Sequence, residues 1–207
     1  MRKLLVLSAL GAMCLLPSCY SLSKEECVAA NWKVIGDTDG AAGYNPQSRF
    51  ADHVKSCERV KVVPDQTTWY QGFQEGIKRY CTPLSGAQRG EAGDGYNNVC
   101  PPDLEQGFMR GYTLGKRVHE VRERMNSIRS SISSREQDTD QRYRELKNAK
   151  DQDRRAIQMR IDDNDFEIRR LRREADDLSY DLSNAERDLA AFRMNPQGDM
   201  RPPVRRY

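Results

Sequence analysis

Hydrophobic positions are distributed unevenly along the chain, and the longest apolar stretch lies at the N-terminus, at Leu4–Leu16. This stretch follows the basic pair Arg2 and Lys3 and is shorter than the roughly 20 residues that a helix needs to cross a bilayer. A basic start followed by a short apolar stretch is typical of a secretory signal peptide. We therefore predict that residues 1–18 are a signal peptide that is cleaved from the mature protein.

Downstream of Ser23, apolar residues recur at helical spacing and polar residues mark helix starts. Ser23 and Glu26 have the spacing of a capping box, which predicts a first helix from Lys24 to about Gly43. Further helices are expected to begin at Asn45-Pro46, Pro64-Asp65 and Pro101-Pro102. Their predicted apolar faces include Phe50, Val54 and Cys57 in the second helix and Trp69, Phe73, Ile77 and Tyr80 in the third.

Glycines interrupt this pattern in two ways. Residues 82–98 contain four glycines and little that is apolar, so we predict a loop there. Elsewhere a glycine-aromatic-x-x-glycine pattern begins at Gly72, Gly107 and Gly111. Because a helical glycine costs ~1 kcal/mol relative to alanine, this repetition predicts close approach of helix backbones. A phosphate-binding loop is not indicated, because no copy follows a strand.

From Lys116 to Asn195 the chain has neither glycine nor proline, and charges of both signs are interspersed. Such a segment is typical of a long exposed helix or coiled coil. Its C-terminal half has two rows of heptad core positions. One row is Ile161, Ile168, Ala175, Leu182 and Leu189, and the other is Asn164, Leu171, Leu178, Ala185 and Phe192. A second register precedes it at Val118, Val121, Met125, Ile128 and Ile132, and the polar stretch between them is either solvated helix or the bend of a hairpin.

The heptad seam needs a partner surface, because burying each Leu or Ile contributes roughly 1.5–3 kcal/mol. The partner can be a second copy, another envelope protein, or the segment Val118–Ile132 folded back on the seam. Ile at one core position and Leu at the other favour a parallel pair, in which Asn164 could fix the register. The absence of glycine and proline argues against the fold-back, so we predict a homodimer.

Six cysteines have different predicted fates. Cys14 leaves with the signal peptide. The sequence Leu16-Pro17-Ser18-Cys19 resembles the bacterial lipobox, with leucine three places before the cysteine and a small residue directly before it. We therefore predict that Cys19 carries lipid and anchors the protein in a membrane. Tyr20 stands where an aspartate would indicate inner-membrane retention, which favours the outer membrane, facing the periplasm. The alternative is an ordinary signal peptide cleaved near Ser18.

The other four cysteines, Cys27, Cys57, Cys81 and Cys100, are an even number in an oxidising compartment, which predicts two disulfides. Zinc ligation is the alternative, but these spacings lack a CxxC pair. Three pairings are possible. The positions of the cysteines at predicted helix ends favour Cys27 with Cys57 and Cys81 with Cys100.

The overall charge gives little indication of a nucleic-acid or anionic-lipid partner. Charged residues make up 31% of the chain, yet the net charge is only +3, and the two cations of the signal peptide contribute to it. No strong attraction for polyanions is therefore encoded. Residues 196–207 carry three arginines and are predicted to form a disordered basic tail.

No catalytic constellation is recognisable. Of the two histidines, His53 lies beside the apolar face of the second helix and is interpreted as a packing or hydrogen-bonding residue, whereas His119 is expected to be exposed. Asp37 and Asp39 resemble the start of a calcium loop, but Ala41 occupies the next ligand position. Asp39 and the following glycine are therefore interpreted as a helix end. We predict no enzyme activity, no metal and no cofactor.

An ordered set of motifs extends over most of the region between Cys27 and Arg117. It consists of Trp32, Gly36, Asp39, Gly40 and Gly43, then His53 and Cys57, then Pro64, Asp65, Tyr70, Gly76, Tyr80 and Cys81, and finally Tyr96, Cys100, Pro101, Phe108, Tyr112 and Gly115. In this set the chain resembles the family named for its domain of unknown function 2799 (DUF2799), whose members are taken to be bacterial lipoproteins. The resemblance implies a lipoprotein with disulfides and implies no activity.

The sequence as a whole predicts an all-α protein. Residues 19–22 are the expected lipidated anchor, residues 23–117 a small disulfide-stapled helical domain, and residues 118–195 a long charged helix or coiled coil. The function class favoured is a structural or interaction protein of the cell envelope, whose coiled coil binds itself or another envelope protein.

The alternative is a ligand-binding or accessory domain. Its groove would lie among Trp32, His53, Asp65 and Tyr70, which bring aromatic, imidazole and carboxylate groups into the same predicted domain.

Overall fold

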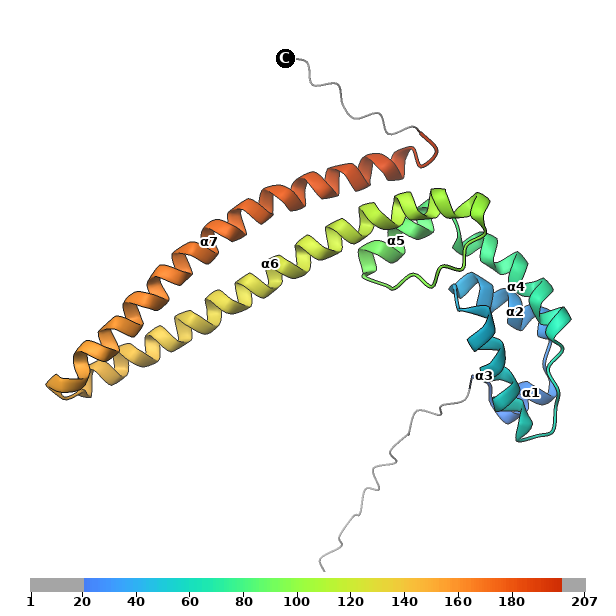
Figure 1. The fold of residues 1–207 in the computed structure, drawn as a ribbon, viewed down its shortest axis with the longest axis horizontal. Helices are drawn as coiled ribbons and strands as arrows, with labels where there is room; N and C mark the ends of the chain where they lie inside the picture. Colours follow the sequence, from blue (N-terminus) through green and yellow to red (C-terminus); the bar gives the residue numbers. More distant parts are fainter. Residues whose placement is uncertain (1–20, 199–207) are drawn as a thin grey trace, which may run out of the picture.

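The computed structural model describes residues 21–198, and these form seven α-helices and no strand (Figure 1). The helices are α1 (Lys24–Val28), α2 (Trp32–Ala42), α3 (Pro46–Glu58), α4 (Gln66–Tyr80), α5 (Pro83–Ala92), α6 (Pro102–Asn148) and α7 (Asp151–Met194). The predicted all-α class is confirmed. Within the described part of the chain, no helix is both long enough and apolar enough to cross a membrane. The predicted signal peptide, Cys19 and most of the C-terminal tail lie outside the described residues.

The two disulfides have the pairing that the helix positions favoured. Cys27 of α1 is bonded to Cys57 of α3, and Cys81, directly after α4, is bonded to Cys100, shortly before α6. All four sulfur-bearing residues are buried. Each bridge therefore holds two segments of the domain together and restricts the conformations of the unfolded chain, which stabilises a small domain.

The predicted first helix is in fact two helices, α1 and α2. α1 ends at Val28, and Asn31 begins α2 by accepting a hydrogen bond from the backbone N–H of Val34 at 3.2 Å. The expected apolar face of α3 also differs, because Val54 is 44% exposed while its neighbour His53 is fully buried. The buried face of α3 includes a polar residue, and a prediction from apolar positions alone does not find such a face.

α2 and α4 pack against each other through glycines on both helices. A Cβ atom added to Gly36 would lie 1.9 Å from the carbonyl oxygen of Trp69, and one added to Gly72 would lie 1.9 Å from that of Lys33. Gly40 and Gly76 face backbone atoms in the same way. Only hydrogen fits at these positions. The predicted close approach of helix backbones is therefore confirmed for Gly72 and also for Gly111, whose added Cβ would lie 2.0 Å from the carbonyl oxygen of Pro83, but not for Gly107, which faces only the side chain of Pro83.

The stretch that was predicted as a loop contains α5, and this prediction was wrong. Gly86 and Gly90 of α5 face the carbonyl oxygens of Phe108 and Tyr112 in α6, where added Cβ atoms would lie 2.1 Å from each oxygen. The glycines that lower the helical propensity of this segment are the ones that let α5 reach the backbone of α6. Contact with α6 compensates for the low propensity.

α2 with α4 and α5 with α6 are two copies of one arrangement. The first helix of each pair has two buried glycines four residues apart and ends three residues later at a left-handed glycine, Gly43 with φ 75° or Gly93 with φ 81°. A Cβ at Gly43 would meet the ring of Tyr80, and one at Gly93 would meet the ring of His119. His119 is therefore half-buried against this turn, and the expectation that it is exposed was wrong.

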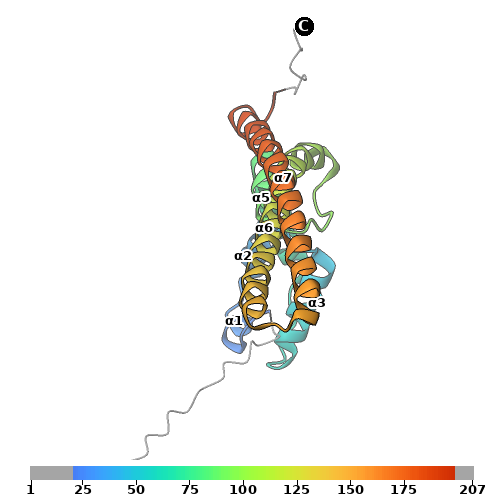
Figure 2. The ribbon, with the colours of Figure 1, turned by 90° about the vertical axis from the view of Figure 1, so that its left-hand side faces the viewer.

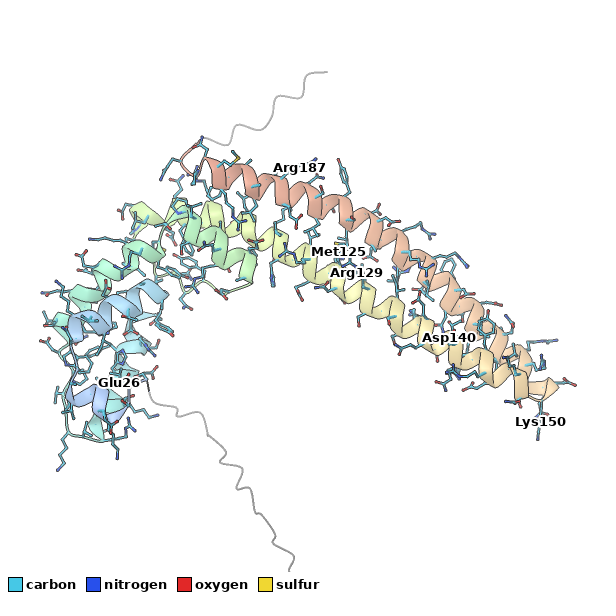
Figure 3. All side chains as sticks on the ribbon, turned by 180° about the vertical axis from the view of Figure 1, so that it is seen from behind. Glu26, Met125, Arg129, Asp140, Lys150 and Arg187 are labelled. Atoms are coloured by element: carbon cyan, nitrogen blue, oxygen red, sulfur yellow. A yellow bond between two sulfur atoms is a disulfide. The ribbon has the colours of Figure 1, made fainter. Side chains whose placement is uncertain are left out.

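α6 and α7 form an antiparallel hairpin, which Figures 1 and 2 show from two sides. α6 ends at Asn148, Ala149 is extended with ψ 143°, and α7 starts at Asp151. The turn at Lys150 lies at the tip, farthest from the domain (Figure 3). At 1.5 Å per residue, the 44 residues of α7 reach ~66 Å. Of the two alternatives, a solvated helix or the bend of a hairpin, the structure has the hairpin, so the prediction against a fold-back, made from the absence of glycine and proline, was wrong.

The heptad seam of α7 packs on the earlier register of α6. Met125, Ile128, Leu171 and Leu178 form one buried cluster, and Val118, Ala185, Leu189 and Phe192 form part of a second cluster nearer the domain. Toward the tip the seam retains the buried Ile161 and Ile168 and also includes a polar contact, in which Asn164 donates to Asp138 at 2.8 Å and accepts from Arg135 at 3.1 Å. The seam therefore has its partner surface within the chain, and Asn164 fixes the register of the hairpin.

Candidate functional site

A buried polar cluster lies at the centre of the disulfide-stapled domain, and we call Ser21, Asp39, Arg49, His53, Ser56 and Trp69 the Asp39 cluster. Asp39 is 2% exposed although it lies within α2. It lies on the glycine-lined face of α2, toward α4, because it stands three residues after Gly36. The interpretation of Asp39 and Gly40 as helix-end residues holds for their backbone, since both carbonyl oxygens accept from the N–H of the C-cap Gly43, but it misses the buried side chain of Asp39.

Three donors surround the carboxylate of Asp39. Nε of Arg49 donates to Oδ1 at 2.7 Å, Nε1 of Trp69 donates to Oδ2 at 3.0 Å, and Nε2 of His53 lies 2.7 Å from Oδ2. Burial raises the pKa of Asp39, but the hydrogen bonds from His53, Arg49 and Trp69 together outweigh burial and hold this pKa below its usual range. Asp39 is therefore a paired carboxylate that links α2 to α3 and α4.

The imidazole of His53 extends this network to the start of the described chain. Nδ1 of His53 lies 2.9 Å from Oγ of Ser21, and the backbone N–H of Ser21 donates to Oγ of Ser56 at 2.9 Å. With a proton on Nε2 directed at Asp39, Nδ1 accepts a hydrogen bond that the hydroxyl group of Ser21 donates. Arg59 also donates to the carbonyl oxygen of Leu22 at 2.8 Å. The segment that precedes α1 is thereby fastened to α3.

Ser21, His53 and Asp39 have the order of atoms found in a nucleophilic triad. Two features favour a structural link instead. The carboxylate is already neutralised by Arg49, and the imidazole, at 0% exposed, has Trp32 and Trp69 packed beside it. Oγ of Ser21 is also 3.0 Å from Oγ of Ser56, so the serine is held in position by its neighbours. The interpretation of His53 as a hydrogen-bonding residue is confirmed by these contacts.

The four residues of the alternative ligand groove are divided between two environments. Trp32 is half-buried and its ring centroid lies 6.3 Å from that of the buried His53. Asp65 is exposed and caps its own helix by accepting from the backbone N–H of Thr68 at 2.9 Å. Tyr70 is 48% exposed and stacks on Phe73. The structure thus brings Trp32 and His53 together and leaves Asp65 and Tyr70 on the surface.

Sequence reasoning missed Arg49, Ser56 and the role of Asp39. One signal was available: an aspartate that shares the face of Gly36 and Gly40 must enter the helix interface. The hydrogen-bond partners of Asp39 lie 10 to 30 residues away in the sequence, so their identity depends on the packing of three helices.

Asp39→Asn is expected to lower the free energy of unfolding by about 2 kcal/mol at neutral pH, because the charged acceptor of three donors is lost. Asp37→Asn on the same helix is the matched control; Asp37 forms an ion pair with Arg79 at the surface, and its loss should be close to neutral. Urea denaturation of both variants measures the difference.

The acid dependence provides a second readout. Since the pKa of Asp39 is lowered on folding, its stabilisation is fully present above the unfolded pKa and is lost as pH falls through the folded pKa. The difference in the free energy of unfolding between wild type and Asp39→Asn should therefore become smaller at acid pH. An equal gap at every pH, or no gap, would contradict the paired carboxylate.

Comparison with known proteins adds a family and no activity. The model of a family described as "Protein of unknown function (DUF2799)" matches residues 31–117, the part that holds α2 to α5, the start of α6 and most of the Asp39 cluster. No curated protein and no solved structure matches the chain. Among residues 21–198, no group of three or more His, Cys, Asp or Glu side chains could hold a metal ion.

Proposed function

Because the chain belongs to the DUF2799 family of unknown function through its disulfide-stapled domain, we propose its role from its architecture. The protein is a non-catalytic lipoprotein of the cell envelope that acts as a structural or interaction protein. Lipid on Cys19 holds it to a membrane, the outer membrane facing the periplasm, and the α6–α7 hairpin presents a surface to an envelope partner.

The hairpin is the observation that carries this proposal. It projects from the domain (Figure 1). Its buried apolar clusters lie along the inner seam between its two helices, and the cluster nearer the domain also includes Ala87 of α5. Ion pairs such as Arg124 with Glu174 and Arg172 with Glu136 join the two helices beside this seam, and charged residues of both signs are exposed along both helices. A long, stiff, solvated pair of helices is suited to contact other proteins at a distance from the domain.

Two further observations support an envelope location. Two disulfides are typical of exported proteins and rare in the cytosol. Ser21 is hydrogen-bonded to Ser56 of α3, and in the sequence only one residue separates Ser21 from Cys19. With a reach of at most about 3.6 Å per residue, lipid on Cys19 would hold the domain directly against the membrane surface.

Photo-crosslinking in intact cells tests the proposal. A photoreactive phenylalanine analogue is placed in the full chain at Tyr143 or Tyr180 of the hairpin, and at Val34 or Tyr70 of the domain as controls. All four side chains are at least 46% exposed. We expect protein adducts from the hairpin positions. Adducts from the domain positions alone would contradict an interaction role of the hairpin.

Cys19→Ser tests the anchor in the same cells. This variant should leave the membrane fraction and lose incorporation of palmitate, because the predicted lipid attachment site is gone. A variant that still fractionates with the outer membrane and still incorporates palmitate would show that the anchor lies elsewhere.

A further inference from the structure

In addition to the two rows of the seam, the outer face of α7 carries a third heptad row, which we call the outer stripe. It consists of Met159, Phe166, Arg173, Tyr180, Arg187 and Met194, at intervals of seven residues. Its apolar members are exposed: Met159 by 56%, Phe166 by 57%, Tyr180 by 70% and Met194 by 89%. Figure 3 shows Arg187 on α7 and Met125 on α6.

The stripe lies opposite the inner seam. In a heptad whose seam positions are Ile161 and Asn164, Phe166 occupies the position that points directly away from the partner helix. Packing within the hairpin therefore gives no reason for methionine and aromatic residues at this position, where coiled coils ordinarily carry polar residues. Four large apolar side chains in one row along a helix form a surface suited to another helix.

The charges beside the stripe alternate in blocks along α7. Arg169 and Arg170 flank it on its two sides, and Asp176 and Asp177 flank it one heptad later. All four are exposed, and among the described residues Arg169, Asp176 and Asp177 form no ion pair. Within residues 21–198, Arg170 pairs with Glu167 and Glu174 of its own helix and with no residue of α6.

We propose that the outer stripe is the contact surface for a second copy of this chain, with the two α7 helices antiparallel about a twofold axis at Arg173. In this register Phe166 of each copy faces Tyr180 of the other. An antiparallel twofold pair brings the same side of each helix together, so Arg169 meets Asp176 and Arg170 meets Asp177, each twice. The surface is thus complementary to itself in its facing aromatic residues and in charge.

The opposite orientation lacks this complementarity. In a parallel pair without stagger, each residue lies at the same height as its own copy on the other helix. Arg169 and Arg170 then face arginines, and Asp176 and Asp177 face aspartates. Like charges placed directly opposite one another are destabilising. The two copies of Arg173 meet at the axis in the antiparallel pair, but each has Asp176 and Asp177 three and four residues away on its own helix.

Cysteine crosslinking of the full chain in membranes with a short bismaleimide tests the register. Arg173→Cys alone should give covalent dimers, because both copies lie at the axis. Phe166→Cys alone and Tyr180→Cys alone should not, while Phe166→Cys coexpressed with Tyr180→Cys should. Dimers from Phe166→Cys alone would show a parallel pair, and no dimers from any variant would exclude the interface.

Charge reversal provides the second arm. Asp176→Arg with Asp177→Arg should weaken dimerisation of the detergent-solubilised chain at least tenfold by analytical ultracentrifugation. Adding Arg169→Asp and Arg170→Asp to the same chain restores the opposite charges and should restore the dimer. No loss in the double variant, or no recovery in the quadruple variant, would overturn the inference.

This inference deepens the proposed interaction role and can fail separately from it. If hairpin positions capture other envelope proteins while the cysteine variants give no dimers, the second copy is excluded and the interaction role stands. If the hairpin positions capture only a second copy of this chain and the cysteine variants do give dimers, the hairpin serves self-association alone.

Discussion

Gly72→Ala is expected to destabilise the domain by roughly 3 kcal/mol, because overpacking of this kind costs more than a helical alanine gains. Its Cβ would lie 1.9 Å from the carbonyl oxygen of Lys33, so α2 and α4 must move apart. Gly107→Ala is the matched control. Both glycines begin the same glycine-aromatic-x-x-glycine pattern, but a Cβ at Gly107 would meet only the side chain of Pro83, at 3.2 Å.

The two variants are compared by thermal and urea denaturation with the disulfides intact. Gly107→Ala should be neutral or slightly stabilising, since alanine has the higher helical propensity. Equal stability of the two variants would show that α2 and α4 do not interlock through their glycines.

Leu171→Asp is expected to open the middle of the hairpin and to cost about 4 kcal/mol, from the lost apolar contacts and the burial of a charge. Leu171 is 8% exposed and packs with Met125 and Ile128 of α6. Phe166→Asp is the matched control on the same helix, because Phe166 points away from α6. The measurement is thermal unfolding followed by circular dichroism, at a protein concentration low enough to keep the chain monomeric.

Only Leu171→Asp should lower the temperature at which the hairpin unfolds and reduce the helical signal. The disulfide-stapled domain should keep its own unfolding transition. If Phe166→Asp were the more damaging change, α7 would bury its outer face and the assignment of the seam would be reversed.

The sequence predicted those parts of the fold that depend on local chemistry. The cap residues Asn45 and Asp65 mark the starts of α3 and α4 because their side chains bond to the first turns of their own helices. The disulfide pairing could be predicted in the same way, because each pair joins helix ends that the sequence places near each other.

Other parts depend on contacts between distant residues and could not be read from the pattern. The glycines of α5 look like loop residues until α6 is in place beside them. A heptad seam has the same spacing whether its partner is a second copy or the preceding helix, so Ile161–Phe192 could not identify its partner. The turn at Ala149–Lys150 contains neither glycine nor proline, and its extended backbone leaves no mark in the sequence.

The Asp39 cluster was missed for a related reason. Asp39 and His53 belong to different helices, and only the packing of α2, α3 and α4 brings them within 2.7 Å. The family match supports this domain as a unit but names no activity for it. The proposed function therefore depends on the hairpin, whose seam is satisfied within the chain and whose outer face is available.

The distance between α6 and α7 at the base of the hairpin tests this account most directly. Arg117 near the base of α6 and Asp188 near the end of α7 form an ion pair at 3.7 Å. Spin labels on Arg117→Cys and Asp188→Cys, in chains diluted with unlabelled protein, should give a pulsed electron–electron resonance distance below about 25 Å, allowing for label length. A single continuous helix would place the two labels more than about 100 Å apart at 1.5 Å per residue. Loss of the short distance on dilution would contradict the hairpin.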